Sequence, residues 1–85
     1  MPLTYTKAEA RKLKIPRQSI HTIQMDREIY TLAKARHWLH KHDFKYDVYK
    51  LTKNYRRFEQ TPSIIGAKYY SDKHDDGLIF VFQEY

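Results

Sequence analysis

The stretch TLAKARHWLHKHDFKYDVYKLTKNYRRFEQ, residues 31–60, decides the fold of this chain. Thr31 suits the N-cap position, because its hydroxyl can accept hydrogen bonds from the first amides of a helix. The apolar residues that follow recur on one face of a 3.6-residue helical period. They are Leu32, Ala35, Trp38 and Leu39. We therefore predict an amphipathic helix that ends near residues 42–43 and packs this face on a sheet.

The second half of the stretch predicts two strands. Residues 44–52 and 55–60 are rich in β-prone residues, and residues 53–54 (Lys-Asn) form a tight connection between them, since asparagine tolerates a positive φ. Successive side chains of a strand point to opposite faces. If Phe58 faces the core, Arg57 therefore lies on the outer face.

Residues 19–25, before the helix, also alternate in the manner of a strand. The alternation allows two assignments of the buried face. In the favoured one the core side chains are His21, Ile23 and Met25. In the other they are Ile20 and Thr22.

The C-terminal part predicts a hairpin. Residues 67–71 and 78–83 flank an Asp-Asp-Gly sequence at 75–77, and Asp-Gly is a strong hairpin-turn signal. Residues 78–82 are apolar on both faces, which is typical of a strand in the centre of a covered sheet. The expected fold is therefore α+β, with one helix on a small, mainly antiparallel sheet in the order β-α-β-β-β-β.

Residues 1–18 are expected to form a basic N-terminal arm, separate from a single α+β domain over residues 19–85. Thr6 and Glu9 have the spacing of a capping box, which predicts a short helix from residue 7 to residue 14 that Pro16 terminates. This helix has few apolar side chains with which to dock. We expect the arm to be partly helical or flexible, or to become ordered on binding.

Composition sets further limits. The 85 residues allow one small domain, and the absence of cysteine excludes disulfides and cysteine-based metal sites. No apolar run is long enough to span a bilayer, and the N-terminus does not have the features of a secretory signal. The net charge is +6. Residues 1–18 carry five basic groups against one acidic, and residues 19–60 carry nine against five. A positive surface on these segments suits a polyanion or an acidic protein.

Residues 19–82 resemble a family of small, uncharacterised proteins of tailed phages and large double-stranded DNA viruses. The pattern is Thr-x-x-x-Ala-x-x-Trp-Leu-x-x-His-x-Phe-Lys, then Thr-x-Asn-x-x-Arg-Phe-x-Gln, then a closing Gly-Leu strand. Its positions here are Thr31, Ala35, Trp38, Leu39, His42, Phe44, Lys45, Thr52, Asn54, Arg57, Phe58, Gln60, Gly77 and Leu78. Asp43 departs from the pattern, where glycine is expected. The resemblance implies a viral or phage origin and supplies no catalytic residues.

Basic and tyrosine side chains alternate along the two central strands. This mixture is typical of nucleic-acid readers, in which cations neutralise phosphates and rings stack on bases. The candidate nucleic-acid-binding residues are Lys45, Lys50, Lys53, Arg56, Arg57, Tyr49 and Tyr55, with Lys12, Lys14 and Arg17 in the arm. Two other interpretations stay open. The basic groups could serve solubility alone, or the protein could be a virion structural component, such as a minor capsid or cement protein that binds acidic capsid proteins.

Enzymatic and metal-dependent functions are not predicted. His37 and His40 lie three residues apart but lack a His-Glu-x-x-His pattern, and Asp72, Asp75 and Asp76 near His74 are explained by turn propensity. We expect no catalytic residues, no metal, no cofactor and no small-molecule substrate. The expected location is the virion or the host cytoplasm or nucleus, not secreted and not membrane-bound. Self-association through an edge strand is a further option.

Overall fold

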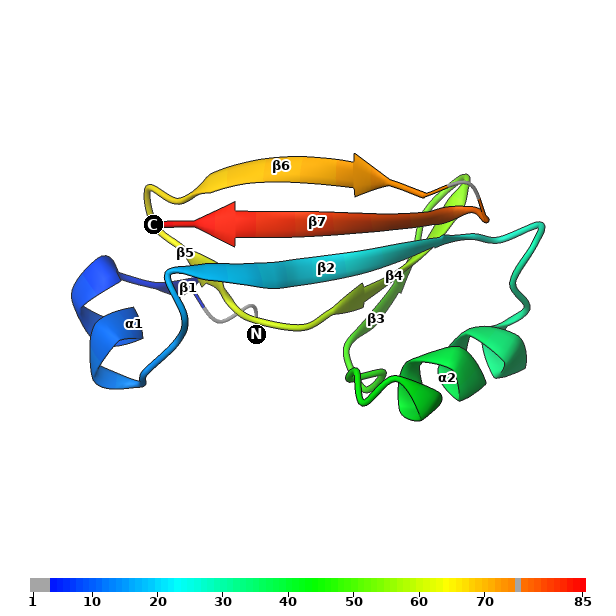
Figure 1. Ribbon diagram of the computed structural model, residues 1–85, viewed down its shortest axis with the longest axis horizontal. Helices are drawn as coiled ribbons and strands as arrows, with labels where there is room; N and C mark the ends of the chain where they lie inside the picture. The colour runs from blue at the N-terminus through cyan, green and yellow to red at the C-terminus, as the bar shows by residue number, and fades with distance from the viewer. Residues whose placement is uncertain (1–3, 75) are drawn as a thin grey trace.

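The chain folds around a five-stranded antiparallel sheet in the order β3-β4-β2-β7-β6, and helix α2 lies against one face of it (Figure 1). The computed structural model describes residues 4–74 and 76–85. The strands are β1 (Thr4–Tyr5), β2 (Gln18–Asp26), β3 (Tyr49–Leu51), β4 (Tyr55–Glu59), β5 (Ser63–Ile64), β6 (Lys68–Lys73) and β7 (Leu78–Glu84). The helices are α1 (Lys7–Lys12) and α2 (Leu32–Lys41). The expected α+β class and β-α-β-β-β-β order are confirmed, and β1 and β5 add a short parallel pair.

Helix α2 forms as its sequence predicts. The Thr31 hydroxyl accepts a hydrogen bond from the amide of Lys34 at 3.2 Å, which satisfies one of the free donors of the first turn. The predicted apolar face packs on the sheet. The side chains with no exposed surface on this side are Ile23, Met25, Ala35, Leu39 and Phe58. The core thus lies between α2 and strands β2 and β4.

The segment after α2 differs from the prediction. Asp43 has a φ of 61°, a left-handed conformation for which glycine has no steric penalty. This explains why glycine is expected there. Residues 44–48 are not a strand, so only the last part of the predicted strand 44–52 is extended. The main-chain groups of Lys45 bond instead to the side-chain amide of Gln60, at 2.8 and 2.7 Å. A side chain has replaced the neighbouring strand as the partner of this segment.

Strand β2 contains a β-bulge at residue 21, because its register with β7 shifts between Ile20 and Thr22. The bulge changes the phase of the strand. Ile20 therefore packs against the same core as Ile23, although three positions separate them. The prediction that His21 faces this core together with Ile23 and Met25 is wrong for His21 and right for the other two. Strict alternation could not reveal the extra residue.

The C-terminal hairpin is confirmed. β6 and β7 pair antiparallel, and β7 is a central strand between β2 and β6, as its apolar sequence indicates. Gly77 follows the turn with a φ of +82°, and a Cβ atom there would lie 2.7 Å from Cδ1 of Ile29. The positive φ favours glycine at this position, and a larger residue would also displace the end of the Ile29 side chain.

The N-terminal segment packs at one end of the sheet, beyond the start of β2 (Figure 1). The capping box of Thr6 and Glu9 is present, and α1 ends at Lys12, slightly before the predicted end. Ala10 is fully buried, and the amide of Tyr85 bonds to the carbonyl of Arg17 at 3.1 Å. Among the described residues, neither helix has the length and apolar character needed to cross a membrane.

Candidate nucleic-acid interface

The face of the sheet opposite α2, called here the open face, carries a row of directly paired residues from all five strands. Strand pairing places Lys50 of β3 opposite Arg57 of β4, Arg57 opposite Gln24 of β2, Gln24 opposite Ile79 of β7, and Ile79 opposite Lys73 of β6. Directly paired side chains lie on the same face. Three cations therefore share one row on the open face.

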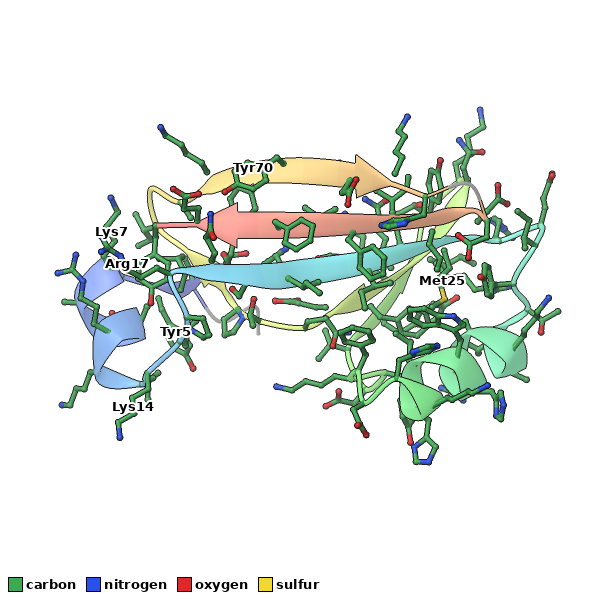
Figure 2. All side chains as sticks on the ribbon, viewed as in Figure 1. Tyr5, Lys7, Lys14, Arg17, Met25 and Tyr70 are labelled. Atoms are coloured by element: carbon green, nitrogen blue, oxygen red, sulfur yellow. The ribbon has the colours of Figure 1, made fainter. Side chains whose placement is uncertain are left out.

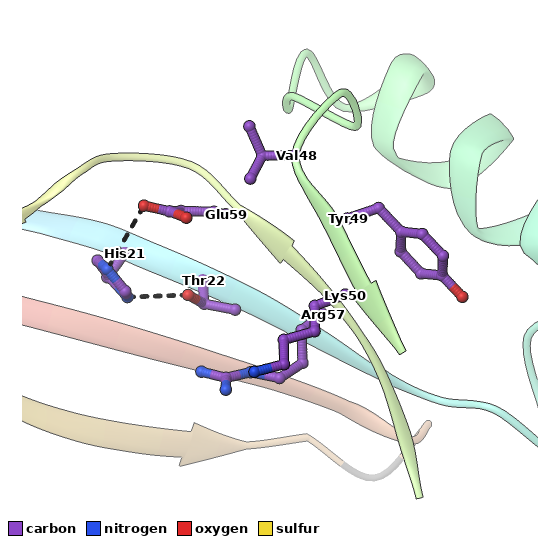
Figure 3. A pocket seen from close by; sticks show the side chains of 7 residues that line it. All are labelled: His21, Thr22, Val48, Tyr49, Lys50, Arg57 and Glu59. Carbon is purple, nitrogen blue, oxygen red and sulfur yellow. Dashed lines mark hydrogen bonds and ion pairs between the residues drawn. The ribbon is translucent and has the colours of Figure 1, made fainter. Parts of the chain in front are cut away.

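Arg57, on β4, is the second residue of this row. Its side chain extends from β4 across β2 toward Thr22 (Figure 3). Its Nε atom is buried and has no hydrogen-bond partner among the described residues. A buried donor without a partner is costly.

A small hollow of about 170 Å³ lies beside Arg57 (Figure 3). It is lined by His21, Thr22, Val48, Tyr49, Lys50, Arg57 and Glu59. Its polar wall is the bulge residue His21. Nδ1 of His21 bonds to the Thr22 hydroxyl at 2.8 Å, and Nε2 bonds to the Ser63 hydroxyl at 3.1 Å. The hollow lies next to the cationic row.

His21 is held in its neutral form. Burial is the largest effect and lowers the pKa of His21 below its usual 6.5, the Glu59 carboxylate raises it, and Arg57 lowers it. Glu59 lies 3.9 Å from Nε2 of His21. The carboxylate nearest to Arg57 along β4 is therefore directed toward the histidine.

The arrangement of Ser63, His21 and Glu59 is not a catalytic triad. In a triad, the acid bonds to the imidazole nitrogen remote from the serine, which fixes the tautomer that accepts the serine proton. Here Glu59 and Ser63 both approach Nε2, while Nδ1 is bonded to a threonine. This geometry does not activate Ser63 as a nucleophile.

The basic side chains of the described residues are free of ion pairs with carboxylates. In residues 4–74 and 76–85, the two close approaches of a carboxylate to a basic side chain both involve histidine, His21 with Glu59 and His74 with Asp72. No lysine or arginine in these ranges is neutralised by an internal carboxylate. A polyanion would therefore not have to displace an internal partner.

The structure separates two of the predicted binding residues from the open face. Arg56 points to the face that α2 covers, where its Nε donates to the carbonyl of Tyr30 at 2.8 Å and its Nη1 donates to the hydroxyl of Tyr49 at 2.9 Å. The Tyr49 ring packs on Phe58 with a centroid distance of 5.1 Å. Arg56 and Tyr49 thus support the core, and only Arg57 and Lys50 meet on the open face.

Tyr55 lies on the open face at the start of β4, outside the row, and Lys53 and Lys45 lie on connecting segments. Lys53 lies in the β3–β4 turn, which Arg27 holds by donating to the carbonyls of Thr52 and Lys53 at 3.3 and 3.4 Å. Tyr55 pairs with Asp26 at the same end of the sheet. Lys45 is exposed on the loop after α2.

The predicted residues of the N-terminal segment lie at the other end of the molecule. Lys14 and Arg17 flank α1 and the start of β2, whereas Met25 lies near the end of β2 (Figure 2). Lys12 is exposed at the last position of α1. The nine residues of β2 span roughly 26 Å. The basic residues of the N-terminal segment and the cationic row are therefore separated by about eight phosphates along one strand of B-form DNA, at ~3.4 Å each.

Sequence reasoning missed three residues on the open face, Lys73, Tyr69 and His21. Tyr69 contacts His21 edge to face at a centroid distance of 5.3 Å, and Lys73 ends the cationic row. The Asp-Gly turn and the alternation of residues 68–73 could have placed Lys73 and Tyr69 on one face. The bulge at His21 had no comparable signal.

Comparisons with known protein families, curated proteins and solved structures found no match to the chain. The viral resemblance therefore rests on its motif residues alone. Within the described ranges, no group of three or more histidine, aspartate or glutamate side chains could hold a metal ion.

Proposed function

We propose that this chain is a non-enzymatic nucleic-acid-binding protein of viral or phage origin, and that the ligand lies across the open face. The observation that supports this best is the row of Lys50, Arg57 and Lys73, whose cations have no carboxylate partners among the described residues. Such a row attracts the phosphates of a nucleic-acid backbone, and the planar guanidinium group of Arg57 suits hydrogen bonds to phosphate oxygens.

Aromatic side chains on the same face fit a ligand with accessible bases. Tyr69 belongs to the open face through its pairing with Gln83, and 45% of its surface is exposed. Tyr55 belongs to this face on β4, two positions from Arg57. Tyrosine rings on a sheet surface can stack on unpaired bases without regard to sequence. DNA is the favoured ligand.

A salt titration tests the proposal and also measures how much of the surface is used. If three phosphates are neutralised, affinity should fall roughly 20- to 40-fold between about 50 and 200 mM salt, and if six are, roughly 300- to 2,000-fold. The larger value would mean that Lys12, Lys14 and Arg17 also contact the backbone. The measurement is fluorescence anisotropy with single- and double-stranded DNA and RNA. Binding that is absent, or that does not depend on salt, would rule out the proposal.

A pair of double variants locates the site. Lys50→Ala/Arg57→Ala should weaken DNA binding and reduce the salt slope by about 2, since each phosphate-contacting cation contributes about 1. Arg36→Ala/Lys41→Ala is the matched control, because it also removes one arginine and one lysine, but from the exposed side of α2. Equal losses in both variants would indicate a general charge effect and remove the open face as the site.

The alternative function is that of a virion structural component, a minor capsid or cement protein. The fully exposed strand β6 favours it, because a free sheet edge can accept a strand from a neighbouring subunit. A structural component would co-sediment with virus particles and would not bind free DNA.

A further inference from the structure

Strand β6 presents a free sheet edge. It is the last strand of the sheet, and all six of its residues are exposed. The strand at the opposite edge, β3, has only three residues. Main-chain groups on a free edge retain unused hydrogen-bonding capacity and can pair with another strand. β6 is thus the longest pairing surface in the described part of the chain.

An apolar groove borders this edge on the face that α2 occupies. It has a volume of about 720 Å³ and is lined by Pro16, Gln18, Ser19, Ile20, Tyr70, Asp72 and Phe82. Tyr70 rises from β6 at its border (Figure 2) and is 44% exposed. A chain that adds to β6 would therefore also cover apolar surface in this groove.

The charges of β6 are complementary to those of a second, antiparallel β6. Lys68, Tyr70 and Asp72 lie on the same face, because they pair with Glu84, Phe82 and Phe80 of β7. Lys68 and Asp72 are equally far from Tyr70 along the strand. When two copies of β6 pair about Tyr70, Lys68 of each copy lies directly opposite Asp72 of the other.

We propose that two copies of this chain associate through β6, antiparallel, about a two-fold axis at Tyr70. The axis is normal to the sheet, so both α2 helices lie on the same side. The two sheets become one ten-stranded sheet, and the two Tyr70 rings meet between the two grooves. This inference stands on the strand edge alone and does not depend on nucleic-acid binding.

Charge selects this register from its neighbours. Directly opposed residues must lie on the same face of the sheet. A symmetric pair is therefore centred on one residue, and moving this centre to the next residue shifts one strand by two residues relative to the other. A centre at Ser71 places Lys68 opposite His74, and a centre at Tyr69 places Lys68 opposite Tyr70. Both shifts lose the two Lys68–Asp72 pairs, and opposite charges directly across an antiparallel pair are stabilising.

Single cysteines give the most direct test, because the chain has none of its own. Opposed residues of an antiparallel pair have Cα atoms about 4.5–5.5 Å apart, within the range of a disulfide. Under oxidation, Tyr70→Cys should form a covalent dimer. The matched variants Tyr69→Cys and Ser71→Cys should not, because each then lies two residues out of register with its own copy. Preferential cross-linking of either control would overturn the proposed axis.

Charge reversal gives a second, independent test by sedimentation equilibrium. Lys68→Asp should raise the dimer dissociation constant roughly tenfold, because two attractive pairs become repulsive. Lys68→Asp/Asp72→Lys should restore it. Lys73→Asp, on the other face and opposite Ala67 of the second copy, should have little effect. Circular dichroism checks that each variant is folded. A native chain that stays monomeric at every concentration, or a double reversal that does not restore association, would disprove the proposal.

Discussion

Arg56 and Arg57 are neighbours in the sequence, but strand β4 turns them to opposite faces of the sheet. On the covered face, Arg56 donates to the carbonyl of Tyr30 and to the hydroxyl of Tyr49. On the open face, Arg57 lies between Lys50 and Gln24, and its buried Nε has no hydrogen-bond partner within residues 4–74 and 76–85. Arg56 thus holds the structure together, whereas Arg57 has no carboxylate partner among the described residues and is a residue that we propose for ligand binding.

The same division applies to the rest of β4. Phe58 is fully buried beneath α2, whereas Tyr55 lies on the open face and is partly exposed. On this strand, residue type alone does not tell whether a side chain supports the fold or is available for binding. The face to which a side chain points decides its role, so variants of adjacent residues should have different phenotypes.

The largest expected effect is on the covered face. Phe58→Ala should reduce the free energy of unfolding by about 3–5 kcal/mol, because it leaves a cavity at a fully buried position. Tyr55→Ala, on the same strand but the open face, should cost less than about 1 kcal/mol. Urea denaturation followed by circular dichroism measures both. Similar losses would contradict the division between the two faces.

The arginine pair tests the comparison directly. Arg56→Ala should reduce the free energy of unfolding by about 2–3 kcal/mol, since it removes charge-assisted hydrogen bonds to Tyr30 and Tyr49. The folded variant should bind DNA with nearly native affinity. Arg57→Ala should not reduce stability, because it removes a buried donor that has no partner among the described residues, and it should weaken DNA binding, with a salt slope lower by about 1. Denaturation and anisotropy are measured on the same preparations, and an exchange of the two phenotypes would refute the assignment.

The helix that covers one face should depend on its cap. Thr31→Ala should cost about 1 kcal/mol, because the amide of Lys34 loses its acceptor. Thr31→Ser, which keeps the hydroxyl, is the control and should stay close to the native value. Thermal denaturation monitors the change. A stability unaffected by Thr31→Ala would mean that the first turn of α2 is not part of the cooperative unit.

The smallest effect is expected at His21. Burial lowers its pKa in the folded protein below the ordinary 6.5, so the unfolded chain binds a proton more readily. Stability should therefore be fully present above about pH 6.5 and decrease as the pH falls from there through the lower pKa of the folded state. His21→Gln should lack this part of the decrease. Parallel stability curves for the two proteins between pH 7 and 5 would contradict the effect.

Much of the fold could be predicted from local patterns. The spacing of Ala35 and Leu39 identified the buried face of α2, and the two-faced apolar sequence of residues 78–82 identified a central strand. These features depend on neighbouring residues in the chain. The loop at residues 44–48 could not be predicted in this way, because a distant side chain, Gln60, takes up the main-chain bonds that a strand would have made.

The candidate site was less accessible to sequence reasoning. The alternation of β4 correctly placed Arg57 and Phe58 on opposite faces of the sheet. Lys73, however, lies in the same row as Arg57 only because of the registers of three strand pairs. Such registers depend on turns and bulges far apart in the sequence. The partners of Arg56 also come from other elements, so its structural role was not visible in the basic and tyrosine pattern.

The bulge in β2 has a consequence for how this chain tolerates changes in length. Deletion of one residue from a regular strand moves every following side chain to the opposite face of the sheet. In a sheet with one buried face, this exposes the apolar side chains and destabilises the fold. Deletion of residue 21 should not have this effect. It would leave Ile20 and Ile23 two positions apart, so both side chains would still point into the core beneath α2. The strand thus contains one residue, His21, that the alternation of its buried apolar side chains does not need.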